Sequence, residues 1–286
     1  LLRLALRPLS SQEDQSRISS VSITVISTIC LWSSLALDIS NIRRTVRHSL
    51  CIDIGNSRAK IGVFLDDVMV SSDFRAQLSQ EYVQRLLDEH DFDSAIISST
   101  RYRNMAFVQA IKKAVPLIEL SYETALPISN NYSTPQTLGM DRIAAAVGAY
   151  TKIPGYAHLI IDAGSCITLD VVNDKGQFLG GNISPGIYMR IKAMNDHTDK
   201  LPLVDIAYHD DSIGRDTVMA LQNGAVRGTI FEIQAFIDHM KFRFPRINTI
   251  LTGGDADFLA NKLESKILAN PYLVLEGLYK ILKHNA

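Results

Sequence analysis

The sequence predicts an α/β protein built from two similar halves. The main observation is a repeated motif: Asp-x-Gly follows a short apolar strand at residues 53–55 and again at residues 162–164, each time inside a strand-turn-strand unit. The second observation is size and composition, because 286 residues with 47% hydrophobic and 21% charged side chains suit a globular enzyme of two medium domains. We therefore expect two mixed sheets, each flanked by helices, with a ligand-binding cleft between the halves.

The first half, residues 50–153, begins with three predicted strands. They cover residues 50–52, 59–65 and 68–74, with turn residues at 55–56 and 66–67. An amphipathic helix, a strand at 94–98 and helices at about 104–114 and 141–150 follow. Pro154-Gly155 then marks a boundary.

The second half, residues 154–286, repeats this order. Strands are predicted at 158–161, 166–172 and 177–183, followed by a long helix at about 216–242 and a strand at 249–252. A helix ending near residue 263 and a last helix at 273–283 complete the chain, and the last helix is expected to pack back on the first half.

Residues 1–49 have a different composition from the rest. They contain no Gly and no Lys, and their six Arg and three acidic residues give a net charge of +3. Residues 21–37 are apolar but carry six Ser or Thr, and they are shorter than the roughly 18–20 apolar residues of a membrane span. A secretory cleavage site is matched only loosely. We expect this segment to be an extension outside the folded enzyme.

Charge and cysteine usage narrow the class of partner. The net charge of −1 gives no positive field to recruit nucleic acid or an anionic membrane, so a small-molecule partner is expected. The three cysteines have no CxxC spacing, which favours neither a disulfide framework nor a zinc site. The seven His show no metal-ligand pair at helical spacing. The sequence predicts a protein of the reducing cytoplasm.

The first Asp-x-Gly turn has the groups that a nucleoside triphosphate requires. Gly55 allows close approach of the backbone, Asn56 and Ser57 offer short hydrogen-bonding groups, Lys60 supplies a cation, and Asp53 could hold Mg²⁺ through water. A plain hairpin with a Gly-Asn turn is the alternative for an isolated match, and the second turn makes that alternative weaker. Neither a GxxxxGK[ST] loop nor a GxGxxG motif after a strand occurs.

A third element, Gly139-Met140-Asp141-Arg142, stands at the start of a predicted helix. Asp141 could simply cap that helix. It could also be a general base that accepts the proton of an attacking hydroxyl. Arg142 would then hold an anionic substrate group or the transferred phosphoryl group.

Together these motifs resemble those of the type III pantothenate kinases, which belong to the sugar kinase, Hsp70 and actin superfamily. That family carries Asp-x-Gly-Asn-Thr/Ser with a following Lys, a Tyr seven residues before Gly-x-Asp-Arg, and then Asp-x-Gly-Thr. Gly180-Gly181 through Pro185-Gly186 and the stretches 200–202, 213–217 and 252–254 agree as well. The resemblance covers Leu50 to the C-terminus and implies a duplicated actin-like, ribonuclease H-like fold with ATP between the halves.

The resemblance also implies an activity, namely transfer of the γ-phosphoryl group of ATP, with Mg²⁺, to the primary hydroxyl of pantothenate. This reaction makes 4'-phosphopantothenate and begins coenzyme A biosynthesis. The residues implied to bind ATP are Asp53, Ile54, Gly55, Asn56, Ser57, Arg58, Ala59, Lys60 and Ser165. Those implied to bind pantothenate are Tyr132, Gly139, Met140, Asp141, Arg142 and Thr217.

Three further roles follow from the same resemblance. Asp141 would be the proton acceptor, and Asp162 would hold a monovalent cation, K⁺ or NH₄⁺. The family is dimeric, so a homodimer is expected, with Thr217 near the partner chain. Ser165 departs from the usual Thr, because it keeps the hydroxyl but lacks the methyl group that restricts the rotamer.

Two alternatives remain at this point. One is a kinase of another small hydroxylated substrate, because the phosphate turns indicate only ATP. The other is a catalytically silent relative that acts as a regulator. The presence of Asp53, Asp141 and Asp162 argues against the silent relative.

Overall fold

The computed structural model describes residues 48–100 and 106–286, and the described residues belong to one compact unit. The predictions for residues 1–47 lie outside the described residues. The first strand was predicted at residues 50–52, and in the structure it is longer, from His48 to Ile54.

The first sheet has the strand order β3-β2-β1-β4-β5. Strands β1 to β3 form an antiparallel meander, and β4 and β5 add parallel to β1. Asp66 and Asp67, between β2 and β3, both have positive φ (44° and 70°), which is typical of a tight two-residue hairpin turn. The strands are β1 (His48–Ile54), β2 (Ala59–Leu65), β3 (Val68–Arg75), β4 (Phe92–Ser99) and β5 (Leu117–Glu119).

The second sheet repeats this arrangement in the order β11-β10-β7-β8-β9-β6. Strands β7 to β9 form the antiparallel meander, and β10 and β11 are parallel to β7. The predicted duplication is therefore confirmed, and β6 is the only strand of the described sheets without a counterpart. The strands are β6 (Ser129–Asn130), β7 (His158–Ala163), β8 (Cys166–Val172), β9 (Gln177–Pro185), β10 (Asn248–Thr252) and β11 (Leu268–Ala269).

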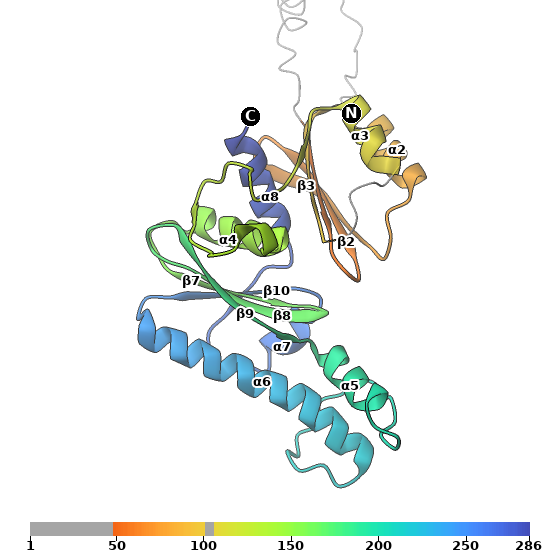
Figure 1. Cartoon of the computed structure of the whole chain (residues 1–286), viewed down its shortest axis with the longest axis vertical. Helices are drawn as coiled ribbons and strands as arrows, with labels where there is room; N and C mark the ends of the chain where they lie inside the picture. The colour runs from red at the N-terminus through yellow and green to blue at the C-terminus, as the bar shows by residue number, and fades with distance from the viewer. Residues whose placement is uncertain (1–47, 101–105) are drawn as a thin grey trace, which may run out of the picture. The chain divides into compact units, whose positions relative to one another are not determined.

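Helices cover both faces of each sheet (Figure 1). Helices α4 and α8 pack on each other between the two sheets, with α8 against β1 and β4 and α4 against β7 and β8. They cross closely because Gly277 has no side chain, and a Cβ there would lie 1.8 Å from the carbonyl oxygen of Ala144. The helices are α2 (Gln80–Glu89), α3 (Ala106–Ala114), α4 (Met140–Lys152), α5 (Ile187–Asp196), α6 (Thr217–Arg243), α7 (Ala256–Ala260), α8 (Leu273–His284) and the 3₁₀ turn η1 (Pro135–Thr137).

The alternation of side chains along the strands sets the direction of the polar residues. In β1, Ile52 belongs to the core under α2 and α3, whereas Cys51 belongs to the core around α4 and α8. Asp53 is two residues from Cys51 and therefore points to the α4 and α8 layer. By the same period, Asp162 points to that layer with Ile160. The two halves thus direct their Asp-x-Gly aspartates toward the same interior layer.

Some elements were not predicted. Strands β5, β6 and β11 have only two or three residues, which is too short for an alternating pattern to be recognised. Helix α5 was also missed, and α7 ends at Ala260 rather than near residue 263. The predicted start of α3 at residue 104 lies outside the described residues.

Candidate active site

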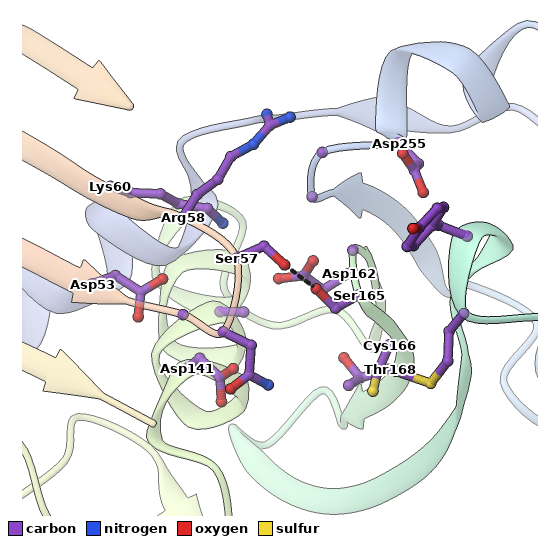
Figure 2. Close-up of a pocket in the computed structure, with 18 of the residues that line it drawn as sticks. Asp53, Ser57, Arg58, Lys60, Asp141, Asp162, Ser165, Cys166, Thr168 and Asp255 are labelled. Atoms are coloured by element: carbon purple, nitrogen blue, oxygen red, sulfur yellow. Dashed lines mark hydrogen bonds between the residues drawn. The ribbon is translucent and has the colours of Figure 1, made fainter. Parts of the chain in front are cut away.

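A cleft of about 530 Å³ lies where β1 and β7 end, and its size suits a small ligand. It is lined by the β1–β2 turn, the start of α4, the β7–β8 turn, α5 and the segment after β10. Figure 2 shows Asp53 and Lys60 on one side of the cleft and Asp162 and Ser165 on the other, with Asp141 from α4 beside them.

The first turn buries its aspartate. Asp53 is 4% exposed, and its Oδ1 has no hydrogen-bond partner among the described residues. Lys60 lies directly across the strand pair from it. Burial raises the pKa of Asp53 to about 7; Lys60 opposes this rise, while Asp141 and Asp162 add to it. Asp53 therefore has unsatisfied capacity to accept a donor or a cation.

The second turn meets the first. The backbone N–H of Gly55 donates to the carbonyl of Arg58 at 3.0 Å, and that of Gly164 donates to the carbonyl of Cys166 at 3.0 Å. Between the two turns, the hydroxyl groups of Ser57 and Ser165 share a hydrogen bond of 2.6 Å, which Figure 2 shows as a dashed line. Short hydroxyl groups and exposed turn backbone from both halves therefore face the same space.

Asp162 completes a group of three carboxylates in the cleft. Desolvation raises the pKa of Asp162, Lys60 lowers it, and Asp141 raises it further. Gly253, after β10, approaches Asp162 so closely that a Cβ would lie 2.5 Å from Oδ1. Asp53, Asp141 and Asp162 lie near Lys60 in this cleft, and carboxylates beside a lysine suit a polyphosphate whose cation is held by one or two carboxylates and water.

Asp141 lies in the first turn of α4. The cap of this helix is Gly139, without a side-chain cap bond, so the interpretation of Asp141 as the capping residue was wrong. Instead, the backbone N–H of Arg142 donates to Asp141 Oδ1 at 2.9 Å, and the Asp141 side chain lines the cleft.

Arg142, the next residue, is held by a carboxylate that the sequence did not reveal. Its Nε donates to Asp170 Oδ2 at 3.0 Å, and its guanidinium carbon lies 5.6 Å from the centre of the Tyr132 ring. The Arg142 and Asp170 side chains are 6% and 1% exposed. Burial raises the pKa of Asp170, and Arg142 opposes that rise.

The structure brings most of the predicted residues together. Those that line the cleft are Asp53, Gly55, Asn56, Ser57, Arg58, Lys60, Asp141, Arg142, Asp162 and Ser165. Ile54 and Ala59 have buried side chains in the core under α2 and α3, so they can offer only backbone groups to a ligand. Tyr132, Gly139, Met140 and Thr217 do not line the cleft; Thr217 is exposed at the start of α6.

Several lining residues were not predicted. Tyr188, Met189 and Lys192 come from α5, and Asp255 follows the Gly253-Gly254 pair. Burial raises the pKa of Asp255, and Arg58 from the other half lowers it. The sequence contained a signal for Asp255, because the two glycines that precede it follow a strand, as the glycines of the two Asp-x-Gly turns do. The α5 residues had none, because the helix itself was not recognised.

Within residues 48–100 and 106–286, no group of three or more His, Cys, Asp or Glu side chains is arranged to hold a metal ion. No helix in the same part of the chain is long and apolar enough to cross a bilayer.

The duplicated sheets, with two Asp-x-Gly turns facing a helix-borne aspartate, define an actin-like protein whose cleft suits a nucleoside triphosphate. Comparisons with known proteins are more specific. The family model described as type III pantothenate kinase matches residues 49–239. The chain belongs to the type III pantothenate kinase family.

Individual relatives agree. A type III pantothenate kinase of Bacteroides fragilis (strain YCH46) is 40% identical over 238 residues, which are 83% of this chain and 98% of the relative. One of Phocaeicola vulgatus is 41% identical over 238 residues, with the same coverage of 83% and 98%. The crystal structure of a Baf family protein from Campylobacter jejuni shares the fold, with a TM-score of 0.55 and 24% identity over 82% of this chain and 98% of that one.

Proposed function

We propose that the cleft transfers the γ-phosphoryl group of ATP to the primary hydroxyl of pantothenate, the first step of coenzyme A biosynthesis. The observation that carries this proposal is the meeting of Asp53, Asp141 and Asp162 with Lys60 in one cleft of a family member. Phosphoryl transfer depends mainly on positioning and on stabilisation of charge, and these residues supply both.

The two turns and Lys60 bind the phosphates of ATP. The turn backbone and the Ser57 and Ser165 hydroxyl groups donate hydrogen bonds, and Lys60 places a positive charge beside them. The buried, unpartnered Oδ1 of Asp53 fits Mg²⁺ held through water. When bound, Mg²⁺ neutralises the charge of the phosphate oxygens.

Asp141 is the general base. Its carboxylate accepts the proton of the pantothenate hydroxyl as that oxygen attacks the γ-phosphorus. The hydrogen bond from the Arg142 backbone fixes one Asp141 oxygen and leaves the other available. Tyr132, Gly139, Met140, Arg142 and Thr217 complete the pantothenate site, with Thr217 reaching it from the partner of a homodimer.

Asp162 holds the monovalent cation, K⁺ or NH₄⁺. The close approach of Gly253 supports this role, because it leaves Asp162 in a narrow, partly buried space beside the carbonyl of Ala163.

The three cysteines without CxxC spacing support a cytoplasmic location for the enzyme.

A coupled assay of ADP formation tests the function. The full chain is incubated with ATP, Mg²⁺, K⁺ and pantothenate, and the product is identified by mass. Asp141→Asn should lower kcat by about 10²- to 10⁴-fold, because general-base catalysis contributes that much. Asp174→Asn, at an exposed turn, is the matched control and should keep activity.

Two results would contradict this proposal. One is absence of turnover by the wild type when ATP binds; turnover of another hydroxylated compound in a substrate panel would then reassign the substrate. The other is full activity of Asp141→Asn. Dimer formation is measured separately by sedimentation.

A further inference from the structure

The buried pair of Arg142 and Asp170 is not explained by the reaction as described above. Asp170 lies in β8 and is 1% exposed. Arg142 Nε lies 3.1 Å from Oδ1 and 3.0 Å from Oδ2 of Asp170, and Nη2 also donates to Oδ1. None of these three hydrogen bonds to Asp170 uses Nη1. Asp170 therefore binds the Nε and Nη2 edge of the guanidinium and does not use Nη1.

Tyr132 restrains the guanidinium from a second direction. The Arg142 guanidinium carbon lies 5.6 Å from the ring centre of Tyr132, a cation–π distance. Tyr132 in turn packs against Phe178 of β9, with ring centres 6.2 Å apart. Arg142 lies on α4 and lines the cleft, and it is restrained by Asp170 of the second half and by Tyr132, which packs against that half through Phe178.

Two neighbouring glycines in β9 make room for both restraints. A Cβ at Gly181, which pairs with Asp170, would lie 2.6 Å from Asp170 Oδ1 and 2.0 Å from the carbonyl oxygen of Leu169. Gly180 has φ of +93°, and a Cβ there would lie 3.0 Å from the Tyr132 ring. The Gly180-Gly181 pair, which carried part of the family resemblance, therefore has a physical purpose beside the cleft.

We propose that Asp170 is a positioning residue, which together with Gly181 fixes the Arg142 guanidinium so that its Nη1 edge binds the carboxylate of the substrate. This inference rests on the proposed function and deepens it by assigning the determinant of substrate charge. Arginine suits the role because its planar fork can bind two carboxylates at different edges. A lysine has a single compact charge, and an ion pair with Asp170 alone would neutralise it.

Charge also explains why a fixed pair is useful here. Asp141 and Asp162 lie in the same cleft and repel an anionic substrate. A mobile arginine would satisfy those carboxylates instead of the substrate. By holding Arg142 from the side of β8, Asp170 keeps one edge of the guanidinium directed to the substrate. Arg142 then cannot form an ion pair with Asp141 or Asp162 instead.

The test compares pantothenate with its alcohol analogue, in which CH₂OH replaces the carboxylate and the reacting hydroxyl is retained. In Asp170→Asn, KM for pantothenate should rise about 10- to 100-fold, the effect of weakening a charged hydrogen bond. KM for ATP and kinetics with the alcohol should change by less than about threefold on the same basis. The wild-type preference for pantothenate over the alcohol should therefore fall by about tenfold or more.

Matched variants separate positioning from folding. Asp174→Asn, an exposed aspartate, should keep the wild-type preference. Asp170→Glu keeps the buried negative charge but displaces the guanidinium by about the length of one methylene group. This variant should fold even if Asp170→Asn does not. It should still lose the preference for pantothenate. Thermal unfolding confirms that each assayed variant is folded.

The outcomes are distinguishable. An equal loss with pantothenate and with the alcohol would overturn the inference and would assign Arg142 to the transferred phosphoryl group. Unchanged preference in folded Asp170→Asn and Asp170→Glu would also overturn it. Failure of the wild type to phosphorylate either compound would instead contradict the proposed function.

Discussion

The two Asp-x-Gly turns occupy equivalent positions in the two halves but differ in the residue across the strand pair. Asp53 faces Lys60 in the first half, whereas Asp162 faces Thr168 in the second. The first turn closes between Gly55 and Arg58, and the second is one residue tighter, from Gly164 to Cys166. A duplicated backbone thus presents a lysine at one turn and a neutral hydroxyl at the other.

This difference favours separate tasks for the two turns. A lysine beside Asp53 attracts phosphate, and the aspartate can share Mg²⁺ with it. Across from Asp162 the equivalent residue, Thr168, adds no positive charge, and the charge that acts on Asp162 is that of Lys60 in the first turn. The same scaffold can therefore hold an anion at one end and a cation at the other.

Among changes that test the difference between the two turns, the largest effect is expected from removal of the charge of Lys60. Lys60→Met should lower kcat/KM for ATP by about 10²- to 10³-fold, the usual loss for one donor aimed at developing charge. The measurement is steady-state kinetics at saturating pantothenate. Lys175→Met, at an exposed turn, serves as the control. A loss below tenfold would remove Lys60 from the phosphate site.

Making the second turn resemble the first should interfere with the cation. Thr168→Lys places an ammonium group across from Asp162, where it competes with K⁺ for the carboxylate. Stimulation of activity by K⁺ should fall about tenfold, as expected for a charge-assisted contact. Thr168→Val, which adds no charge, is the matched variant. Equal K⁺ stimulation in wild type and Thr168→Lys would contradict the cation role of Asp162.

A smaller effect is expected at the hydroxyl pair that joins the turns. Ser165→Ala should raise KM for ATP by about five- to tenfold, because one neutral hydrogen bond is lost. Ser165→Thr restores the residue usual in the family and keeps the hydroxyl, so KM should stay within about twofold of the wild type. A larger loss in Ser165→Thr than in Ser165→Ala would mean that space, rather than hydrogen bonding, decides at this position.

The smallest effect concerns stability and pH in the ligand-free protein. The pKa of Asp53 is raised to about 7, so the folded state keeps a proton that the unfolded state releases near pH 4. The stabilisation is complete below about pH 4 and is lost as pH rises through about 7. The Tm of the wild type should therefore fall by about 10 °C relative to Asp53→Asn between pH 4 and pH 8. A constant difference in Tm across this range would show that Asp53 is not desolvated.

Much of the fold and most of the nucleotide side of the site could be predicted, because both depend on local patterns. A strand followed by Asp-x-Gly is readable over a few residues, and its repetition predicted the duplication that the sheets confirm. By contrast, α5 and Asp170 were not found. Asp170 lies in the apolar strand β8, where one acidic residue has no local signal of a partner 28 residues away on α4.

The sequence by itself determined the two Asp-x-Gly turns, the order of the longer strands in each half and the family to which the motifs belong. Only the tertiary structure decided that Asp53, Asp141 and Asp162 share one cleft and that Asp170 grips Arg142. The physical reason is that strand alternation fixes which face a residue points to, while the partner across that face depends on how α4 and α8 pack between the sheets. The turn at Asp53 can be predicted from neighbouring residues alone. The site to which it contributes depends on how the helices and sheets pack.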